Sequence, residues 1–138
     1  MQRIMTDMLF NEKGCAAIVL ISCLAAKAFM SAQRIMILTK TKGDKDKANK
    51  LFKVEPFHSY HKSQMNDAEW APIVIGTLFY TALQGIDTGY GCTLAAIGSV
   101  VYVWGNLLSK GAMPNPVGAL PRYTGTGMIA YANLSNSM

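Results

Sequence analysis

The sequence predicts an all-α integral membrane protein, built as an up-down bundle of four transmembrane helices. Hydrophobic residues make up 51% of the 138-residue chain and charged residues only 15%, whereas soluble domains carry about 25% charged residues. The apolar residues lie in long runs, and much of the charge lies in one stretch between two of them. The length suits one domain, so we expect residues 1–138 to form a single bundle.

The first predicted helix covers about residues 14–38, which are rich in Ala, Ile, Leu and Cys. About 20 residues span a bilayer, so this run is long enough even with some tilt. Lys27 and Arg34 interrupt it, and their separation of seven residues places them on one helix face.

The next stretch, residues 39–56, is predicted to be a solvated basic loop. Six lysines oppose three acidic residues here, which gives a net charge of +3. Gly43 breaks the preceding helix and Pro56 closes the loop.

The second predicted helix begins near Phe57 and ends near Leu83, with residues 62–83 as its spanning part. Its first part is polar and its second part, from Ala71 onward, is apolar. We therefore expect it to emerge from the bilayer on one side.

Two shorter spans follow, at about residues 92–108 and 118–134. Gly98 and Gly105 give the third span small positions for close helix contact. A loop up to Pro121 is expected before the fourth span, which leaves about residues 122–134 for the helix. This span reaches ordinary spanning length only if it starts back near Val117.

Loop charges predict the orientation of the bundle. The basic loop 39–56 and the third connection, with Lys110 and Arg122, lie on the same side, whereas the second connection carries only Asp87. The positive-inside rule then places both basic connections in the cytosol or its organellar equivalent, with the termini facing away.

Two other classes of site are not predicted. The net charge of +5 is not accompanied by basic residues interleaved with exposed aromatics or by a nucleic-acid-binding motif. His58 and His61 are three residues apart, but only Glu55 lies near them as a third ligand. We therefore expect interfacial histidines, no metal site and no nucleic acid, with the lipid bilayer as the main partner.

Polar residues within the predicted helices need partners. Lys62, Asn66 and Glu69 share one face of the second helix, as Lys27 and Arg34 share one face of the first. We expect these faces to meet, with Glu69 paired to Lys27 or Arg34. Two interpretations stay open: a polar clamp between helices, or a site for a small zwitterionic or anionic ligand.

Residues 62–72, KSQMNDAEWAP, resemble the helix-2 signature of the MAPEG family, the membrane-associated proteins in eicosanoid and glutathione metabolism. Five residues fit the order of that signature: Gln64, Asn66, Glu69, Trp70 and Pro72. Residues 31–34 resemble the basic end of the family's first helix, and residues 102–105 its Tyr-x-x-Gly on the third helix. Residues 114–120 resemble a Pro-x-Pro-x-Arg-Ala-Leu connection, so the resemblance covers most of the chain in order.

The resemblance implies a left-handed four-helix bundle that assembles as a homotrimer and binds glutathione between neighbouring subunits. By this resemblance, Asn66 and Glu69 would hold the amino end of glutathione, with help from Gln64. Arg34 and Lys62 would hold its carboxylates.

The same resemblance implies catalytic roles for Arg34 and Tyr102, the latter as a wall or hydrogen-bond donor. The chain also departs from the family, because Lys62 replaces an arginine and loses its bidentate fork. Glutathione chemistry needs a thiolate, which nearby positive charge stabilises. Four further positions lack the Arg, Arg, Tyr and Arg of other members: Gln33, Ser99, Asn106 and Gly118.

Two hypotheses about function follow. The first is a glutathione-dependent transferase or peroxidase that acts on a lipophilic electrophile from the bilayer. The second is a non-catalytic membrane subunit of a larger complex, respiratory or photosynthetic, which keeps the fold after losing arginines. Either protein would lie in the endoplasmic reticulum or an organellar membrane.

Overall fold

The computed structural model describes residues 11–110 and 116–138, and these residues form α-helices without any strand. The helices are α2 (Glu12–Lys40), α3 (Lys45–Phe52), α4 (Phe57–Leu83), α5 (Tyr90–Leu108) and α6 (Pro116–Ser135). The all-α prediction is therefore confirmed for the described part of the chain.

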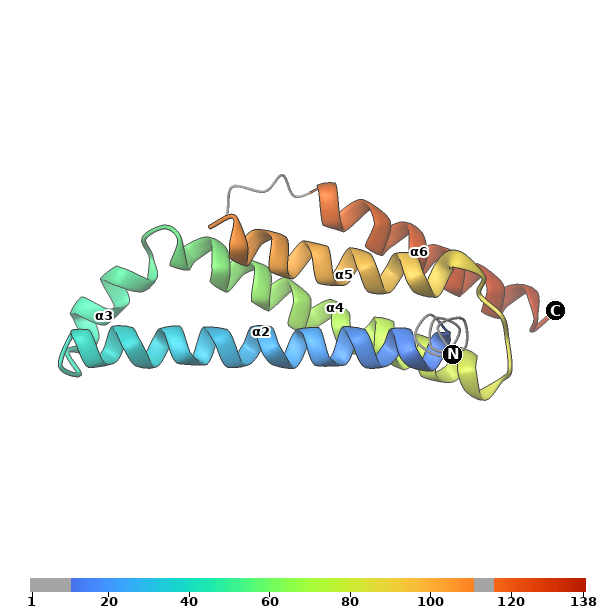
Figure 1. Ribbon diagram of the computed structural model, residues 1–138, viewed down its shortest axis with the longest axis horizontal. Helices are drawn as coiled ribbons and strands as arrows, with labels where there is room; N and C mark the ends of the chain where they lie inside the picture. Colours follow the sequence, from blue (N-terminus) through green and yellow to red (C-terminus); the bar gives the residue numbers. More distant parts are fainter. Residues whose placement is uncertain (1–10, 111–115) are drawn as a thin grey trace, which may run out of the picture.

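Four long helices lie side by side, and the short α3 caps one end of the molecule (Figure 1). Helix α2 runs along α4, while α5 and α6 form the closest pair. The start of α2 and the end of α6 lie at the opposite end from α3 (Figure 1). This arrangement agrees with successive long helices running in alternating directions.

The predicted helix boundaries lie close to those observed. Helix α4 begins and ends where the second helix was predicted, and α2 and α5 each extend slightly beyond the predicted spans. Helix α6 begins at Pro116, so Pro121 lies inside it rather than before it. Pro116 fits the first position of the helix because the backbone N–H groups there lack intrahelical partners.

The prediction of a continuous loop over residues 39–56 was wrong, because α3 forms within it. Gly43 makes the turn out of α2 with a φ of +78°. The Asp44 carboxylate then caps α3 by accepting hydrogen bonds from the backbone N–H groups of Asp46 and Lys47, each at 3.1 Å. Ala48 is buried at the centre of α3, so this short helix docks on the long ones.

The interior of the bundle is made mainly of small side chains. One cluster packs α2, α4, α5 and α6 together, with the residues Cys15, Ala16, Val19, Ala71, Val74, Leu78, Cys92, Ala95, Ala96 and Ile129. A second cluster lies toward α3, with the residues Ala26, Met30, Tyr60, Tyr102, Val103 and Leu107. Small residues allow close helix contact, which is typical of helix interfaces in membranes.

Three glycines set the distance between α5 and α6. A Cβ atom on Gly98 would lie 2.2 Å from the backbone nitrogen of Arg122. A Cβ on Gly118 would lie 2.4 Å from the Tyr102 backbone, and one on Gly125 would lie 2.3 Å from the Ala95 nitrogen. No larger residue fits these positions without moving the helices apart.

Large apolar side chains point outward instead. Four spanning helices were predicted, and among the described helices two, α2 and α5, are long and apolar enough to cross a membrane. In the most apolar stretch of each, 28% of α2 and 56% of α5 is buried. Exposed large apolar residues occur on every long helix, including Ile21, Leu24, Ile35, Ile73, Tyr80, Ile97, Leu120 and Tyr131.

Candidate functional site

The expected pairing between Glu69 and the cations of the first helix was wrong. The side chains of Lys27 and Glu69 are exposed, and Arg34 instead contacts His61, with 3.0 Å between Arg34 Nη2 and His61 Nδ1. Lys62 and Glu69 are seven residues apart and lie on the outer side of α4. The predicted polar face of this helix therefore does not act as one surface. Lys62 and Glu69 point outward, whereas Asn66 points toward α6.

Arg122 of α6 is the partner of Asn66. It is fully buried, and its Nη2 donates a hydrogen bond to Asn66 Oδ1 at 2.7 Å. A longer bond of 3.4 Å runs from the same nitrogen to the Tyr123 hydroxyl. The prediction that Arg122 belongs to a basic connection was wrong. Helix α6 starts at Pro116, and the Arg122 side chain lies inside the bundle.

Aromatic rings surround the Arg122 guanidinium. Its central carbon lies 4.3 Å from the centre of the Tyr102 ring, 5.2 Å from that of Tyr123 and 5.6 Å from that of Trp70. Each ring offers its electron-rich face to the cation, which offsets part of the cost of burying the charge. The Trp70 and Tyr123 rings also pack edge to face, with centres 4.8 Å apart.

The hydrogen-bond donors of Arg122 are only partly paired at this site. Its Nε and Nη1 atoms have no hydrogen-bond partner among the described residues. Asp67, which is 3% exposed, lies close enough for its carboxyl to interact electrostatically with the guanidinium. The junction of α4, α5 and α6 therefore holds a buried polar centre with an excess of donors.

Sequence reasoning missed this centre although a signal for it was present. An arginine between apolar residues is unusual in a membrane helix and marks a site by default. Arg122 was instead counted with Lys110 as a charge of the third connection, although it lies within the predicted span of residues 118–134. Asp67 was counted among the polar residues at the start of the second helix.

The structure brings two of the predicted site residues, Asn66 and Tyr102, to this buried centre. Gln64 is half-buried, and Lys62 and Glu69 are exposed on the outer side of α4. Arg34 lies elsewhere, in a pocket at the end of the bundle that α3 covers. Within one chain, the predicted residues thus occupy separate places.

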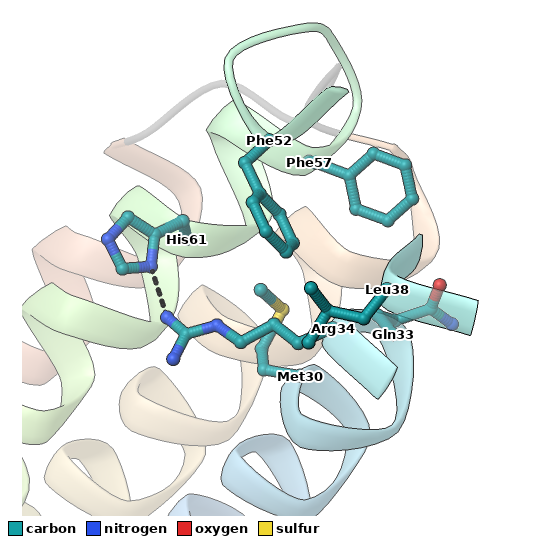
Figure 2. A pocket seen from close by; sticks show the side chains of 7 residues that line it. All are labelled: Met30, Gln33, Arg34, Leu38, Phe52, Phe57 and His61. Carbon is teal, nitrogen blue, oxygen red and sulfur yellow. Dashed lines mark hydrogen bonds between the residues drawn. The ribbon is translucent and has the colours of Figure 1, made fainter. Parts of the chain in front are cut away.

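The pocket around Arg34 has a volume of about 330 Å³. Figure 2 shows the guanidinium reaching toward His61, with the rings of Phe52 and Phe57 on the other side. Because arginine only donates hydrogen bonds, Nδ1 of His61 is the acceptor in this contact. The pocket is lined by Met30, Gln33, Arg34, Leu38, Phe52, Phe57 and His61.

Comparison with protein-family models, with curated proteins and with solved structures finds no match for this chain. Within residues 11–110 and 116–138, no group of three His, Cys, Asp or Glu side chains is placed to hold a metal ion. Function is therefore inferred from the geometry and from the residue pattern on α4.

Proposed function

We propose that this chain is a multi-pass membrane protein in which α2, α4, α5 and α6 all cross the bilayer as a MAPEG-like bundle. The small interior residues and the large outward apolar residues support this, because lipid tails solvate an apolar exterior as well as a protein core does. The endoplasmic reticulum or an organellar membrane is the proposed location.

One observation carries the proposal for function: Glu69 and Lys62 are exposed on an outer face of α4 that also exposes Met65 and Ile73. A charged side chain near the bilayer centre costs about 2.5–3.5 kcal/mol on insertion scales. Glu69 lies near the middle of α4, so contact with lipid alone would leave its charge unpaired. This face is better explained as a contact with a neighbouring subunit and a polar ligand.

We infer that the ligand is glutathione and that it binds between copies of a homotrimer. Glu69 would accept hydrogen bonds from the amino end, with help from Gln64, and Lys62 would hold a carboxylate. Arg34 lies in its own pocket beneath α3, so it has no part in this proposed site. The proposed activity is a transferase or peroxidase on a lipophilic electrophile. In this proposal Asn66 and Tyr102 act by holding Arg122, rather than by the direct contact that the resemblance implies.

Isothermal titration of glutathione into the purified protein in lipid nanodiscs tests this proposal. We expect binding at millimolar or lower concentration, and a loss of at least tenfold in affinity for Glu69→Gln, because a charge-assisted hydrogen bond is removed. Glu55→Gln is the matched control, since Glu55 is an exposed carboxylate outside this face. No binding at millimolar glutathione would rule out the enzyme.

A specific observation favours a second candidate, a non-catalytic subunit of a larger respiratory or photosynthetic complex. Asn66 and Tyr102 are already engaged by Arg122. By the resemblance, Gln33, Ser99 and Gly118 occupy positions where some MAPEG proteins carry arginine. The face of α4 would then contact another membrane subunit. Co-migration with a large complex on a native gel supports this candidate, and a small homotrimer opposes it.

A further inference from the structure

The pocket around Arg34 combines one cationic side chain with apolar walls. Its volume of about 330 Å³ lies in the range of sites for small organic ligands, which is about 300–1,000 Å³. None of the described residues that line it is acidic. The charge of the pocket is therefore positive, and it favours an anionic group.

Arg34 has donors to spare for such a group. Among the described residues its guanidinium makes one hydrogen bond, to His61, although the side chain carries five N–H donors. The bond to His61 holds the planar guanidinium in one orientation (Figure 2). A fixed guanidinium can bind a carboxylate or phosphate through two parallel hydrogen bonds.

The remaining walls suit a hydrocarbon chain. Met30 and Leu38 of α2 line one side, and Phe52 and Phe57 line the side toward α3 and the start of α4 (Figure 2). The thioether of Met30 adapts its shape to an irregular apolar ligand. An anionic head and an apolar chain together define an amphiphile.

The position of α3 explains how such a molecule would reach the pocket. Lys45, Lys47 and Lys50 are exposed on this short helix, whereas Ala48 is buried and Phe52 is half-buried. A basic amphipathic helix lies at the membrane surface and attracts anionic lipid headgroups. If the bundle spans the bilayer as proposed, Arg34 lies at headgroup level beneath α3.

We propose that this pocket binds a single-chain anionic amphiphile, with its headgroup on Arg34 and its chain between Met30, Leu38 and Phe52. The headgroup is a carboxylate or a phosphate, which are the chemistries of a fatty acid and of a lysophospholipid. The inference rests on the membrane placement proposed above, but it does not depend on glutathione binding.

Displacement of a fluorescent fatty acid from the full chain in a non-ionic detergent tests the inference. The competitors are palmitate, palmitoyl lysophosphatidate and the uncharged monopalmitoylglycerol. We expect one site per chain, with the better anionic competitor binding roughly tenfold or more tightly than the uncharged one. The preference between palmitate and lysophosphatidate identifies which headgroup the pocket takes.

Two variants and two matched controls locate the site. Arg34→Gln should weaken the anionic competitor roughly tenfold without affecting the uncharged one, and Phe52→Ala should weaken both. Lys40→Gln removes an exposed cation from the same helix, and Leu51→Ala removes an exposed apolar residue next to Phe52. Neither control residue lines the pocket, so neither should change the affinity.

Equal affinity for charged and uncharged competitors, or an unchanged affinity in Arg34→Gln, would overturn the inference. An equal loss in Lys40→Gln would also overturn it, because it would mean attraction to the basic surface in general. Glu69→Gln separates this site from the proposed glutathione site, since it should weaken glutathione and leave palmitate binding unchanged. Failure of amphiphile binding with intact glutathione binding would refute this inference alone.

Discussion

At the residue scale, Arg122 connects three helices through one side chain. It sits on α6, donates to Asn66 of α4 and packs against the Tyr102 ring of α5. A buried cation loses its hydration, and it is tolerated only where hydrogen bonds and aromatic faces replace part of that hydration. Asn66 supplies the shortest of these bonds, so its removal should cost more than the loss of one neutral contact.

Asn66→Leu is expected to destabilise the bundle by about 1.5–3 kcal/mol, the value of a hydrogen bond to a charged group. Thermal unfolding of the detergent-solubilised protein, followed by circular dichroism, measures the change. Met65→Ala is the control, because Met65 is the adjacent residue and is exposed. An equal loss of stability in both variants would mean that the bond to Arg122 contributes nothing specific.

At the scale of helices, the contact between α5 and α6 depends on glycine. Gly98→Ala places a Cβ where the Arg122 backbone stands, and backbone atoms cannot move aside as a flexible side chain can. We expect a loss of about 1–3 kcal/mol or more in unfolding free energy. Gly76→Ala is the matched control, because nothing lies within 4 Å of its Cβ position.

In that control, alanine replaces glycine within α4, so its stability should stay the same or rise by up to about 1 kcal/mol. The two variants are compared by the same thermal unfolding measurement. If Gly98→Ala were as stable as Gly76→Ala, α5 and α6 could not lie as close as described.

Helix α3 depends on a charged cap. The backbone N–H of Lys47 holds the pKa of the Asp44 carboxyl below its ordinary value, and the Lys47 side chain acts in the same direction. A lowered pKa means that the folded state favours the ionised carboxylate. The cap is therefore fully present above the unfolded pKa of about 3.9, and it is lost as pH falls through the lowered folded value.

We expect α3 to unwind in acid before the long helices do. Amide hydrogen exchange at Lys47 and Ala48, measured from pH 6 to pH 3, should show falling protection only at the acid end, after correction for the intrinsic exchange rate. In Asp44→Ala, the amide protection of α3 should be as low at every pH as it is in the native chain at acid pH. A pH-independent protection of α3 in the native chain would contradict the role of the cap.

At the scale of the whole molecule, the proposed spanning bundle has a testable consequence for its orientation in the bilayer. The α3 end and the end of α6 lie at opposite ends of the bundle (Figure 1), so they should lie on opposite sides of the membrane. Cysteines introduced by Lys47→Cys and Ser137→Cys test this with a membrane-impermeant thiol reagent on sealed vesicles. Labelling of both from the same side would refute a spanning bundle.

The native cysteines give a low background for this experiment. Cys15 and Cys92 are buried, and Cys23 is half-buried. By the positive-inside rule, Lys47→Cys should be labelled from the cytosolic side or its organellar equivalent.

The sequence predicted the helices well because their positions follow from local properties. The length of an apolar run, a glycine or proline break and a change from polar to apolar residues set the bounds of α2, α4 and α5. The prediction of a loop over residues 39–56 missed α3. The many lysines were interpreted as a solvated loop, and the capping role of Asp44 was not considered. The α6 start was placed too late because Pro121 was interpreted as a loop residue.

The candidate site was less predictable, because the face that a side chain occupies depends on contacts between distant segments. The spacing of Lys62, Asn66 and Glu69 was correct as a pattern, but it could not determine that Asn66 turns toward Arg122. Arg34 likewise contacts His61 rather than the predicted Glu69. The sequence had indicated only that His61 lies at the membrane interface.

By itself, the sequence determined an all-α chain with long apolar helices, a basic stretch between the first two and a polar pattern on α4. These features depend on residues close together in the chain, so periodicity and composition reveal them. Only the tertiary structure decided which polar groups lie inside, where Arg122 is enclosed by aromatic rings, and which lie in the pocket beneath α3. These choices depend on close packing across glycines far apart in sequence, since helices must approach before their buried charges find partners.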